Sequence, residues 1–446
     1  MKLPEFESLG IFTFVYGGIA FRNVLKLRQP LWLFFLVGAL ATVALGVLTP
    51  QQAYSAVNLQ VLVFLFSMFV VASGLKISGL LGRLGDFINH AARGLGALFL
   101  FFFIFGAASA FLMNDPLAII GTPVALYLAD GAGVEPFPFL LALAFGVTTG
   151  SELTPMGNPQ NLLVAVESGV KAPIVQFTQL LLLPTLVNFG LASAFLALAY
   201  KRGKPAPVRS ADPRVNGDRR LELVTISGIV VVVVGLFLVN WLQLEGFTPP
   251  LDISGVALLG AAVVLGLGGR EKEIMRDVDW GILVMFAGLF VVTQGMWDSG
   301  LVSAIASVIP PPSPGGSLML VLIPAILLSQ VISNVPMVAL YIPLMKMAGF
   351  GPSSLDAWAA LAAGSTVAGN LTLMGAASNL IIVEQEEDER GKSSMDFWKF
   401  AAYGLPLTVL NTLVIYVFLA TGVKIPRRSL FRASFPCYTS SRTPAT

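Results

Sequence analysis

Charged residues are absent from several very long stretches of this chain. None occurs between Arg28 and Lys76, between Lys171 and Lys201, or between Asp298 and Lys346. Only 12% of the 446 residues are charged and 56% are hydrophobic, whereas a soluble domain carries about a quarter charged residues. Apolar runs of about 18 residues or more can cross a bilayer as helices. The sequence therefore predicts an all-α, multi-pass integral protein of the cell membrane.

Ten membrane-spanning segments are expected along the chain. They cover residues 6–21, 31–49, 57–75, 137–168, 176–200, 223–244, 253–269, 280–297, 357–383 and 400–420. The segments 137–168 and 357–383 are interrupted by polar and glycine residues, and 6–21 is the least apolar. Whether 6–21 crosses the membrane is left open by its composition.

Two further apolar stretches, 94–130 and 317–349, are broken in the middle by a polar turn that contains proline. The turns read Asn-Asp-Pro at 114–116 and Ser-Asn-Val-Pro at 333–336. Each half is too short to span a bilayer comfortably, so we interpret both stretches as re-entrant helical hairpins. The tips of such hairpins lie near the middle of the bilayer, where exposed backbone is tolerated only if protein or a water-filled cavity surrounds it.

The two halves of the chain resemble each other. FVVASGLKISGL at 69–80 matches FVVTQGMWDSGL at 290–301, and NDPLAIIGTP at 114–123 matches NVPMVALYIP at 334–343. GVTTGSELTPMGNPQNLLV at 146–164 matches GSTVAGNLTLMGAASNLII at 364–382. The blocks keep their order and nearly their spacing, which indicates an internal duplication.

Five spans per half is an odd number, so the two repeats are predicted to run in opposite senses across the membrane, as in many secondary transporters. Lysine and arginine concentrate in the loops that this arrangement places in the cytoplasm. The expected organisation is a first repeat (1–200), a cytoplasmic linker (201–220), a second, inverted repeat (221–423) and a disordered tail (424–446).

Several function classes are excluded or disfavoured. Cys437 and His90 are the only residues of their kinds, so disulfides and a cysteine metal site are excluded. The basic residues lie in short loops and do not indicate a nucleic-acid partner. No HExxH or GxGD motif is present, which leaves an intramembrane enzyme as a remote alternative. No cofactor is expected beyond a coupling ion, Na⁺ or H⁺.

The two interrupted segments carry polar residues at matched positions. We call residues 151–160 the first break and residues 369–378 the second break. Breaking a helix frees carbonyls on one side, which suit Na⁺, and N–H groups on the other, which suit an anion. The alternative is that glycine and proline merely kink packed helices. The candidate substrate and ion ligands here are Thr154, Gly157, Asn158 and Asn161 in the first break, and Asn370, Thr372, Gly375, Ser378 and Asn379 in the second.

Two carboxylates lie inside otherwise uncharged stretches, Asp115 at the first hairpin tip and Glu152 in the first break. A charge at membrane depth costs about 2.5–3.5 kcal/mol on insertion scales, and it is usually paired or functional. Asp115 is therefore a candidate cation ligand or proton carrier. Alternatively, it caps the helix that starts at the following proline.

The hairpin tips and the Gly-x-x-x-Asn loops GNPQN and GAASN resemble those of the ion transporter superfamily, from about residue 25 to about residue 420. Its members include arsenite permeases, NhaD-type Na⁺/H⁺ antiporters, citrate transporters and divalent anion:sodium symporters. The resemblance implies an elevator-type transporter whose tip ligands are Asn114 and Asn334, with Ser333 beside the latter. The Asn-Asp tip is more similar to the arsenite-permease and antiporter branches than to the symporters' Ser-Asn-Thr.

Together these features predict a secondary active permease for a small inorganic or carboxylate anion. Its expected partners are this anion and the lipid bilayer. The candidate Na⁺ ligands are Asn114, Asn161, Asn334 and Asn379. A Na⁺/H⁺ antiporter that uses Asp115 is the alternative. The sequence leaves open the substrate, the coupling ion, the direction of transport and the choice between a monomer and a homodimer.

Overall fold

A computed structural model describes residues 3–19, 29–205, 217–308 and 312–423. Every regular element in this part of the chain is helical, and one isolated bridge joins Val134 to Pro205. The long apolar runs account for this result, because a helix satisfies its backbone hydrogen bonds internally.

The first half of the chain forms the following elements: α1 (Leu3–Phe12), the π-helical turn η1 (Thr13–Gly17), α3 (Leu31–Ala44), α4 (Pro50–Ala56), α5 (Leu59–Ile77), α6 (Leu80–Ala91), α7 (Leu95–Ser109), α8 (Asn114–Ala132), α9 (Phe137–Ser151), α10 (Pro159–Glu167) and α11 (Pro173–Arg202). The second half forms α12 (Arg219–Leu244), α13 (Ile253–Gly268), α14 (Glu271–Asp277), α15 (Trp280–Asp298), α16 (Leu301–Val308), α17 (Met319–Ile332), α18 (Asn334–Met347), α19 (Leu355–Leu371), the 3₁₀ turn η2 (Leu373–Gly375), α20 (Ala377–Arg390) and α21 (Phe397–Thr421).

Five of these helices are long and apolar enough to cross a membrane, namely α5, α11, α12, α15 and α21. Each coincides with a span expected from the sequence. The helix that forms at the expected span 31–49 is shorter than predicted, because α3 ends at Ala44 and a turn follows in which Gly46 has a φ of 77°. The next helix, α4, then begins behind a capping box formed by Thr49 and Gln52.

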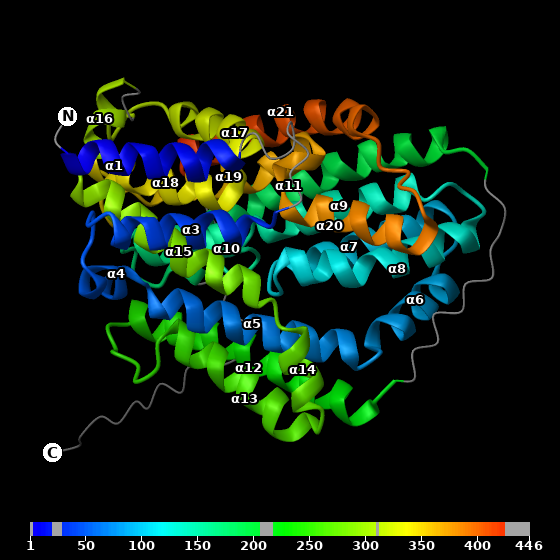
Figure 1. Ribbon diagram of the computed structural model, residues 1–446. Coiled ribbons are helices and arrows are strands. Elements are labelled where there is room, and N and C mark those ends of the chain that lie inside the picture. The colour runs from blue at the N-terminus through cyan, green and yellow to red at the C-terminus, as the bar shows by residue number, and fades with distance from the viewer. Residues whose placement is uncertain (1–2, 20–28, 206–216, 309–311, 424–446) are drawn as a thin grey trace, which may run out of the picture.

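Each predicted hairpin stretch contains two helices, α7 with α8 and α17 with α18. The two pairs have their bases at opposite ends of the molecule (Figure 1). At one end, Glu135 after α8 pairs with Lys399 of α21 at 3.0 Å. At the other, Lys346 of α18 pairs with Glu167 of α10 at 2.9 Å. The hairpins therefore enter from opposite ends, whereas the orientation of complete repeats in a bilayer stays a prediction.

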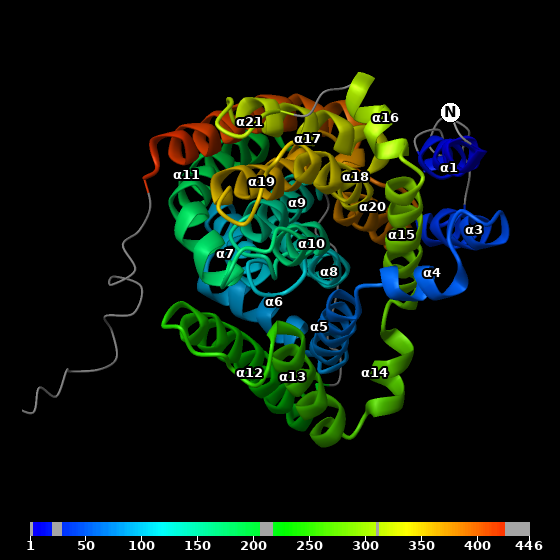
Figure 2. The same cartoon turned by 90° about the vertical axis from the view of Figure 1, so that its left-hand side faces the viewer.

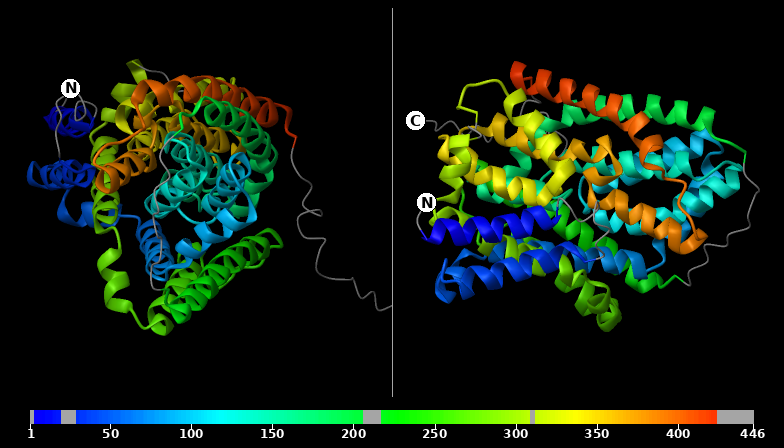
Figure 3. Two further views of the ribbon diagram at one scale, coloured as in Figure 1. Left: turned by 90° about the vertical axis from the view of Figure 1, so that its right-hand side faces the viewer. Right: turned by 45° about the horizontal axis from the view of Figure 1, so that its top comes forward.

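The helices separate into two packed groups (Figures 2 and 3). One group contains α7 to α11 and α17 to α21, and α11 packs against α21 within it. The other contains α3, α5, α12, α13 and α15, in which α5 packs on α13 and α15 packs on α3. We call the first group the core bundle and the second the frame.

The expected domain boundaries are only partly within the described residues. Helix α11 ends at Arg202 and α12 begins at Arg219 behind its cap Asp218, so helices enter both ends of the predicted linker 201–220. Residues 206–216 and the predicted disordered tail 424–446 lie outside the described residues.

Candidate functional site

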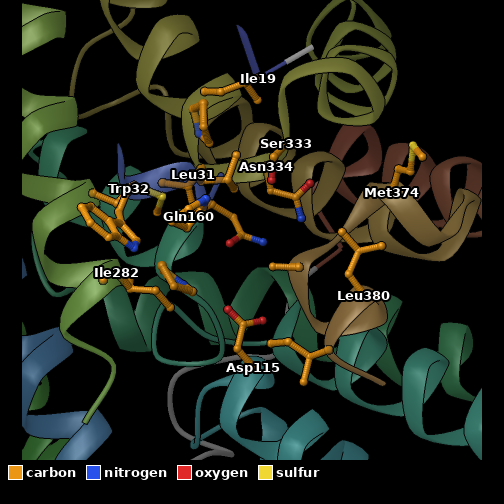
Figure 4. Close-up of a pocket in the computed structure, with 18 of the residues that line it drawn as sticks. Ile19, Leu31, Trp32, Asp115, Gln160, Ile282, Ser333, Asn334, Met374 and Leu380 are labelled. Atoms are coloured by element: carbon orange, nitrogen blue, oxygen red, sulfur yellow. The ribbon is translucent and has the colours of Figure 1, made fainter. Parts of the chain in front are cut away.

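Both hairpin tips line a single cavity of about 820 Å³ at the centre of the molecule. Asn114 and Asp115 reach it from α8, and Ser333 and Asn334 reach it from the start of α18. Figure 4 shows Asp115 and Asn334 pointing toward each other across the cavity, with Gln160 of α10 to one side. Residues more than two hundred positions apart thus share one site.

Besides α3 of the frame, whose first residue Leu31 lines it, four helices of the core bundle begin at this cavity. Their first residues are Asn114 (α8), Pro159 (α10), Asn334 (α18) and Ala377 (α20), and all four line it. Helices α8, α18 and α20 carry no side-chain cap at these ends, although the first N–H of α8, on Asn114, is taken by the Gly157 carbonyl. Free N–H groups and the positive ends of helix dipoles favour an anion.

The second tip is conformationally strained. Ser333 has a φ of 69° and a ψ of 162°, in a region that non-glycine residues rarely adopt. Such a backbone costs of the order of 1–3 kcal/mol and clusters at ligand sites. The strain allows α17 to end at Ile332 and α18 to start only two residues later, which places the N-terminus of α18 in the cavity wall.

The first break is held by a close network of hydrogen bonds. The backbone N–H of Asn114 donates to the Gly157 carbonyl at 3.0 Å, so the hairpin tip rests on the break. Thr154 donates to the Ala110 carbonyl. A Cβ on Gly157 would lie 2.5 Å from the Ser151 Cα, which explains why only glycine fits there.

The second break uses a related arrangement. Asn379 donates to the Gly369 carbonyl at 2.6 Å and to the Thr372 carbonyl at 3.3 Å. Thr372 donates to Gln330 of α17 at 2.7 Å. A Cβ on Gly375 would lie 2.0 Å from the Ala368 carbonyl oxygen, so this position also requires glycine.

Thr366 of α19 joins the two halves of the site. Its hydroxyl accepts a hydrogen bond from Asn158 at 3.1 Å and donates to Asn161 at 3.0 Å. Thr366 is not among the ligands predicted from the sequence. Its signal was present, since it matches Thr148 in the duplicated blocks 146–164 and 364–382.

Several buried acceptor oxygens around the breaks have no hydrogen-bond partner among the described residues. They belong to Asn114, Asn334, Asn370 and Asn379. Buried polar atoms are normally satisfied, so such oxygens are suited to a bound ion or solute. Three of the four predicted Na⁺ ligands fit this condition. Asn161 differs, because its amide oxygen already accepts from Thr366.

Ser378 is also buried with an unpartnered hydroxyl. It lies one residue after Ala377, which lines the cavity at the start of α20. The structure therefore places it beside the second break, as the sequence predicted.

The charge of the cavity wall is negative. Asp115 is half-buried, and Asp279 and Glu384 line the same cavity, whereas none of its described lining residues is lysine or arginine. Asp279, Glu384, Gln160 and Gln330 also line the cavity but are not among the ligands predicted from the sequence. Gln160 belongs to the GNPQN loop, whereas the other three carry no such motif and only packing brings them to the cavity.

Glu152 differs from the other predicted ligands. It is fully buried, but it does not line the cavity and contacts Asn188 of α11 instead. No group of three histidine, cysteine or acidic residues in the described part of the chain is arranged to hold a metal ion.

This fold and site define a multi-pass membrane transporter with a central cavity between two hairpins. A family model described as "Citrate transporter" matches residues 24–364, and the chain belongs to this citrate transporter family. It is a transporter and not an enzyme, and it is a multi-pass protein of the cell membrane.

Curated relatives agree with this assignment. A silicon efflux transporter of Oryza sativa subsp. japonica is 29% identical over 85% of this chain and 90% of its own length. An uncharacterized transporter of Mycobacterium tuberculosis is 27% identical over 92% and 97%. A putative arsB transporter of Dictyostelium discoideum is 21% identical over 85% of both chains.

Two solved structures share the fold. The YdaH transporter of Alcanivorax borkumensis has a TM-score of 0.55 at 16% identity, over 94% of this chain and 98% of its own. Neisseria gonorrhoeae MtrF, from a class of antimetabolite efflux pumps, has a TM-score of 0.55 at 13% identity, over 89% and 96%.

Proposed function

We propose that the protein is a secondary active, ion-coupled permease for a small inorganic or carboxylate anion. The observation that carries this proposal is the convergence of four helix N-termini on one cavity. Their N–H groups and dipole ends offer an anion several hydrogen bonds, and the described residues of the lining include no cationic side chain. The unpartnered amide oxygens of Asn114 and Asn334 in turn suit a coupling cation.

The separation into core bundle and frame supports an elevator mechanism. Both hairpins and both broken helices, which hold the candidate ligands, belong to the core bundle. Salt bridges such as Asp130–Arg390 at 2.8 Å and Glu167–Lys346 at 2.9 Å connect helices within that bundle. The bundle can therefore move as one body against α5 and α15 and carry the site with it.

A Na⁺/H⁺ antiporter is the second candidate function. It is favoured by the three carboxylates Asp115, Asp279 and Glu384 in a cavity without described cationic side chains. Under this alternative the cavity takes the cation itself, and no anion is moved.

The choice between a monomer and a homodimer, which the sequence left open, is a separate question, and the homodimer stays a prediction.

The test is solute flux into proteoliposomes that contain the purified full-length protein, with and without gradients of Na⁺ and H⁺. The family and its relatives suggest citrate, silicic acid and arsenite as trial solutes. We expect Asn114→Ala and Asn334→Ala to reduce flux at least about tenfold, a loss of about 1.4 kcal/mol or more. Both should keep their thermal stability, because the oxygens removed have no described partner.

Asn89→Ala is the matched control, since Asn89 is an asparagine on α6 away from the cavity. It should transport as the wild type does. Cation exchange without movement of any anion or neutral solute would favour the antiporter, and normal flux in both tip variants would refute the site.

A further inference from the structure

Glu152 occupies a second polar site behind the cavity. It follows the last residue of α9 and is completely buried, facing α11. The side-chain amide of Asn188 donates to both of its carboxylate oxygens, at 3.1 and 3.3 Å. Asn188 is also completely buried, and its own oxygen has no described partner.

No charged side chain of the neighbouring helices pairs with Glu152 in the described structure. Helix α7 has no charged residue, and the two carboxylates of α8 are Asp115, in the cavity, and Asp130, which pairs with Arg390. The basic residues of α11, Lys201 and Arg202, lie in its last turn, more than a dozen residues beyond Asn188.

The remaining neighbours, α19 and α20, contribute no cation either. The one charged residue of α19, Asp356, lies in its first turn, far along the helix from the break. On α20, Glu384 lines the cavity, Glu386 accepts from Ser393 and Ser394, and Arg390 pairs with Asp130. A buried carboxylate without a cation is costly to keep ionised.

We propose that Glu152 and Asn188 form a proton-carrying site, separate from the solute cavity, that supplies the coupling ion. Glu152 binds the proton and Asn188 is a positioning residue. This inference rests on the proposed ion-coupled transport. It makes specific the sequence-based expectation that Glu152, in the first break, binds substrate or an ion.

The amide of Asn188 can serve both protonation states. With Glu152 ionised, the amide nitrogen donates to the carboxylate, as in the structure. With Glu152 protonated, a half-turn of the amide presents its oxygen, which now accepts from the new O–H group. The O–H bond forms with a proton from one side of the membrane and breaks by release to the other.

A proton fits this site better than a metal ion does. Hard cations take about six or more oxygen ligands, whereas the described structure places only two side chains against the carboxylate of Glu152, the amide of Asn188 and the hydroxyl of Thr185 on the same helix. Protonation also removes the charge before Glu152 moves through the membrane with the core bundle, which avoids the cost of carrying a bare carboxylate.

Infrared difference spectra of the purified full-length protein between acidic and alkaline pH test protonation without any solute. We expect a carboxylic-acid C=O band that is absent from Glu152→Gln and present in the control Glu167→Gln, which removes a partly exposed carboxylate paired with Lys346. In Asn188→Leu the band should shift to higher frequency, because the acid loses its hydrogen-bond partner. A band unchanged in Glu152→Gln would overturn the proposal.

The second measurement is proton flux in proteoliposomes with a trapped pH dye and citrate, silicic acid or arsenite as the driving solute. We expect Glu152→Gln to lose solute-driven proton flux at least about tenfold while solute counterflow continues. If the wild type moves none of these solutes, the proposed function fails, and the infrared band still decides whether Glu152 binds a proton. Unchanged proton flux in Glu152→Gln would refute its role as the carrier.

Discussion

At the scale of single residues, Asp115 separates the leading mechanisms. Its side chain lines the cavity together with Asp279, and no capping hydrogen bond from it is present at the start of α8. The capping alternative from the sequence therefore lacks structural support. A half-buried carboxylate opposite Asn334 is well placed to attract a cation into the cavity.

We expect Asp115→Asn to weaken the dependence of transport on Na⁺ and to reduce Na⁺-coupled flux at least about tenfold, whereas the pH dependence assigned to Glu152 should remain. The amide keeps the shape of the side chain but not its charge, so solute counterflow should persist. The measurement is flux across a range of pH, with and without Na⁺. Asp298→Asn, at the end of α15 and outside the cavity, is the control and should behave as the wild type. If Asp115→Asn showed wild-type coupling under all conditions, a functional role for the Asp115 carboxylate would be ruled out.

At the scale of helices, the close crossing of α7 and α9 holds the first hairpin against the first break. A Cβ on Gly150 would lie 1.8 Å from the Gly106 carbonyl oxygen. Ser109 adds a hydrogen bond to the Val147 carbonyl at 2.7 Å. Small residues that allow such backbone approach are typical of helix packing in membranes.

We expect Gly150→Ala to destabilise the protein by roughly 1–3 kcal/mol, because one backbone must move away from the other. The apparent thermal unfolding midpoint in detergent should fall by several degrees. Gly190→Ala on α11 is the control, since a Cβ there would meet no atom within 4 Å. An equal midpoint for the two variants would show that the α7–α9 crossing is looser than the structure indicates.

At the scale of the whole molecule, the core bundle and the frame meet where α8, α10 and α18 lie against α5 and α15 and where α11 lies against α12. Ser73 of α5 and Ile119 of α8 line a shared small cavity of about 50 Å³ at this boundary. An elevator movement must separate such residues, whereas residues within the bundle keep their distances.

In a Cys437→Ser background, we expect a short cleavable crosslink between Ser73→Cys and Ile119→Cys to reduce flux at least about tenfold. Cleavage should restore it. The same crosslink between Glu167→Cys and Lys346→Cys joins two helices of the core bundle, and transport should continue. Full flux with the first crosslink in place would exclude movement at this boundary.

Sidedness is a second prediction for the whole molecule. The excess of lysine and arginine places the linker 201–220 in the cytoplasm and the loops 169–175 and 245–252 outside. Single cysteines in these loops, in the same Cys437→Ser background, should react with an impermeant maleimide on intact cells only at the two outer loops. Labelling of the linker from outside would contradict the inverted arrangement.

The sequence by itself determined the membrane class, the limits of the five long spanning helices to within a few residues, the polar tips and the breaks at 151–160 and 369–378. These features are local, because hydrophobicity, proline, glycine and missing charge act on the backbone where they occur. Asn114 and Asn334 were selected because these tips resemble those of the ion transporter superfamily. Only the tertiary structure decided which side chains share a cavity.

Thr366 joins α19 of the second half of the chain to the first break, and Gln160, Gln330 and Asp279 reach the cavity from different parts of the sequence. Glu152, in contrast, turns toward α11. Past a break, the direction of a side chain depends on how the half-helix is rotated, and that rotation is set by packing against helices far away in the sequence. The local sequence pattern does not determine this rotation.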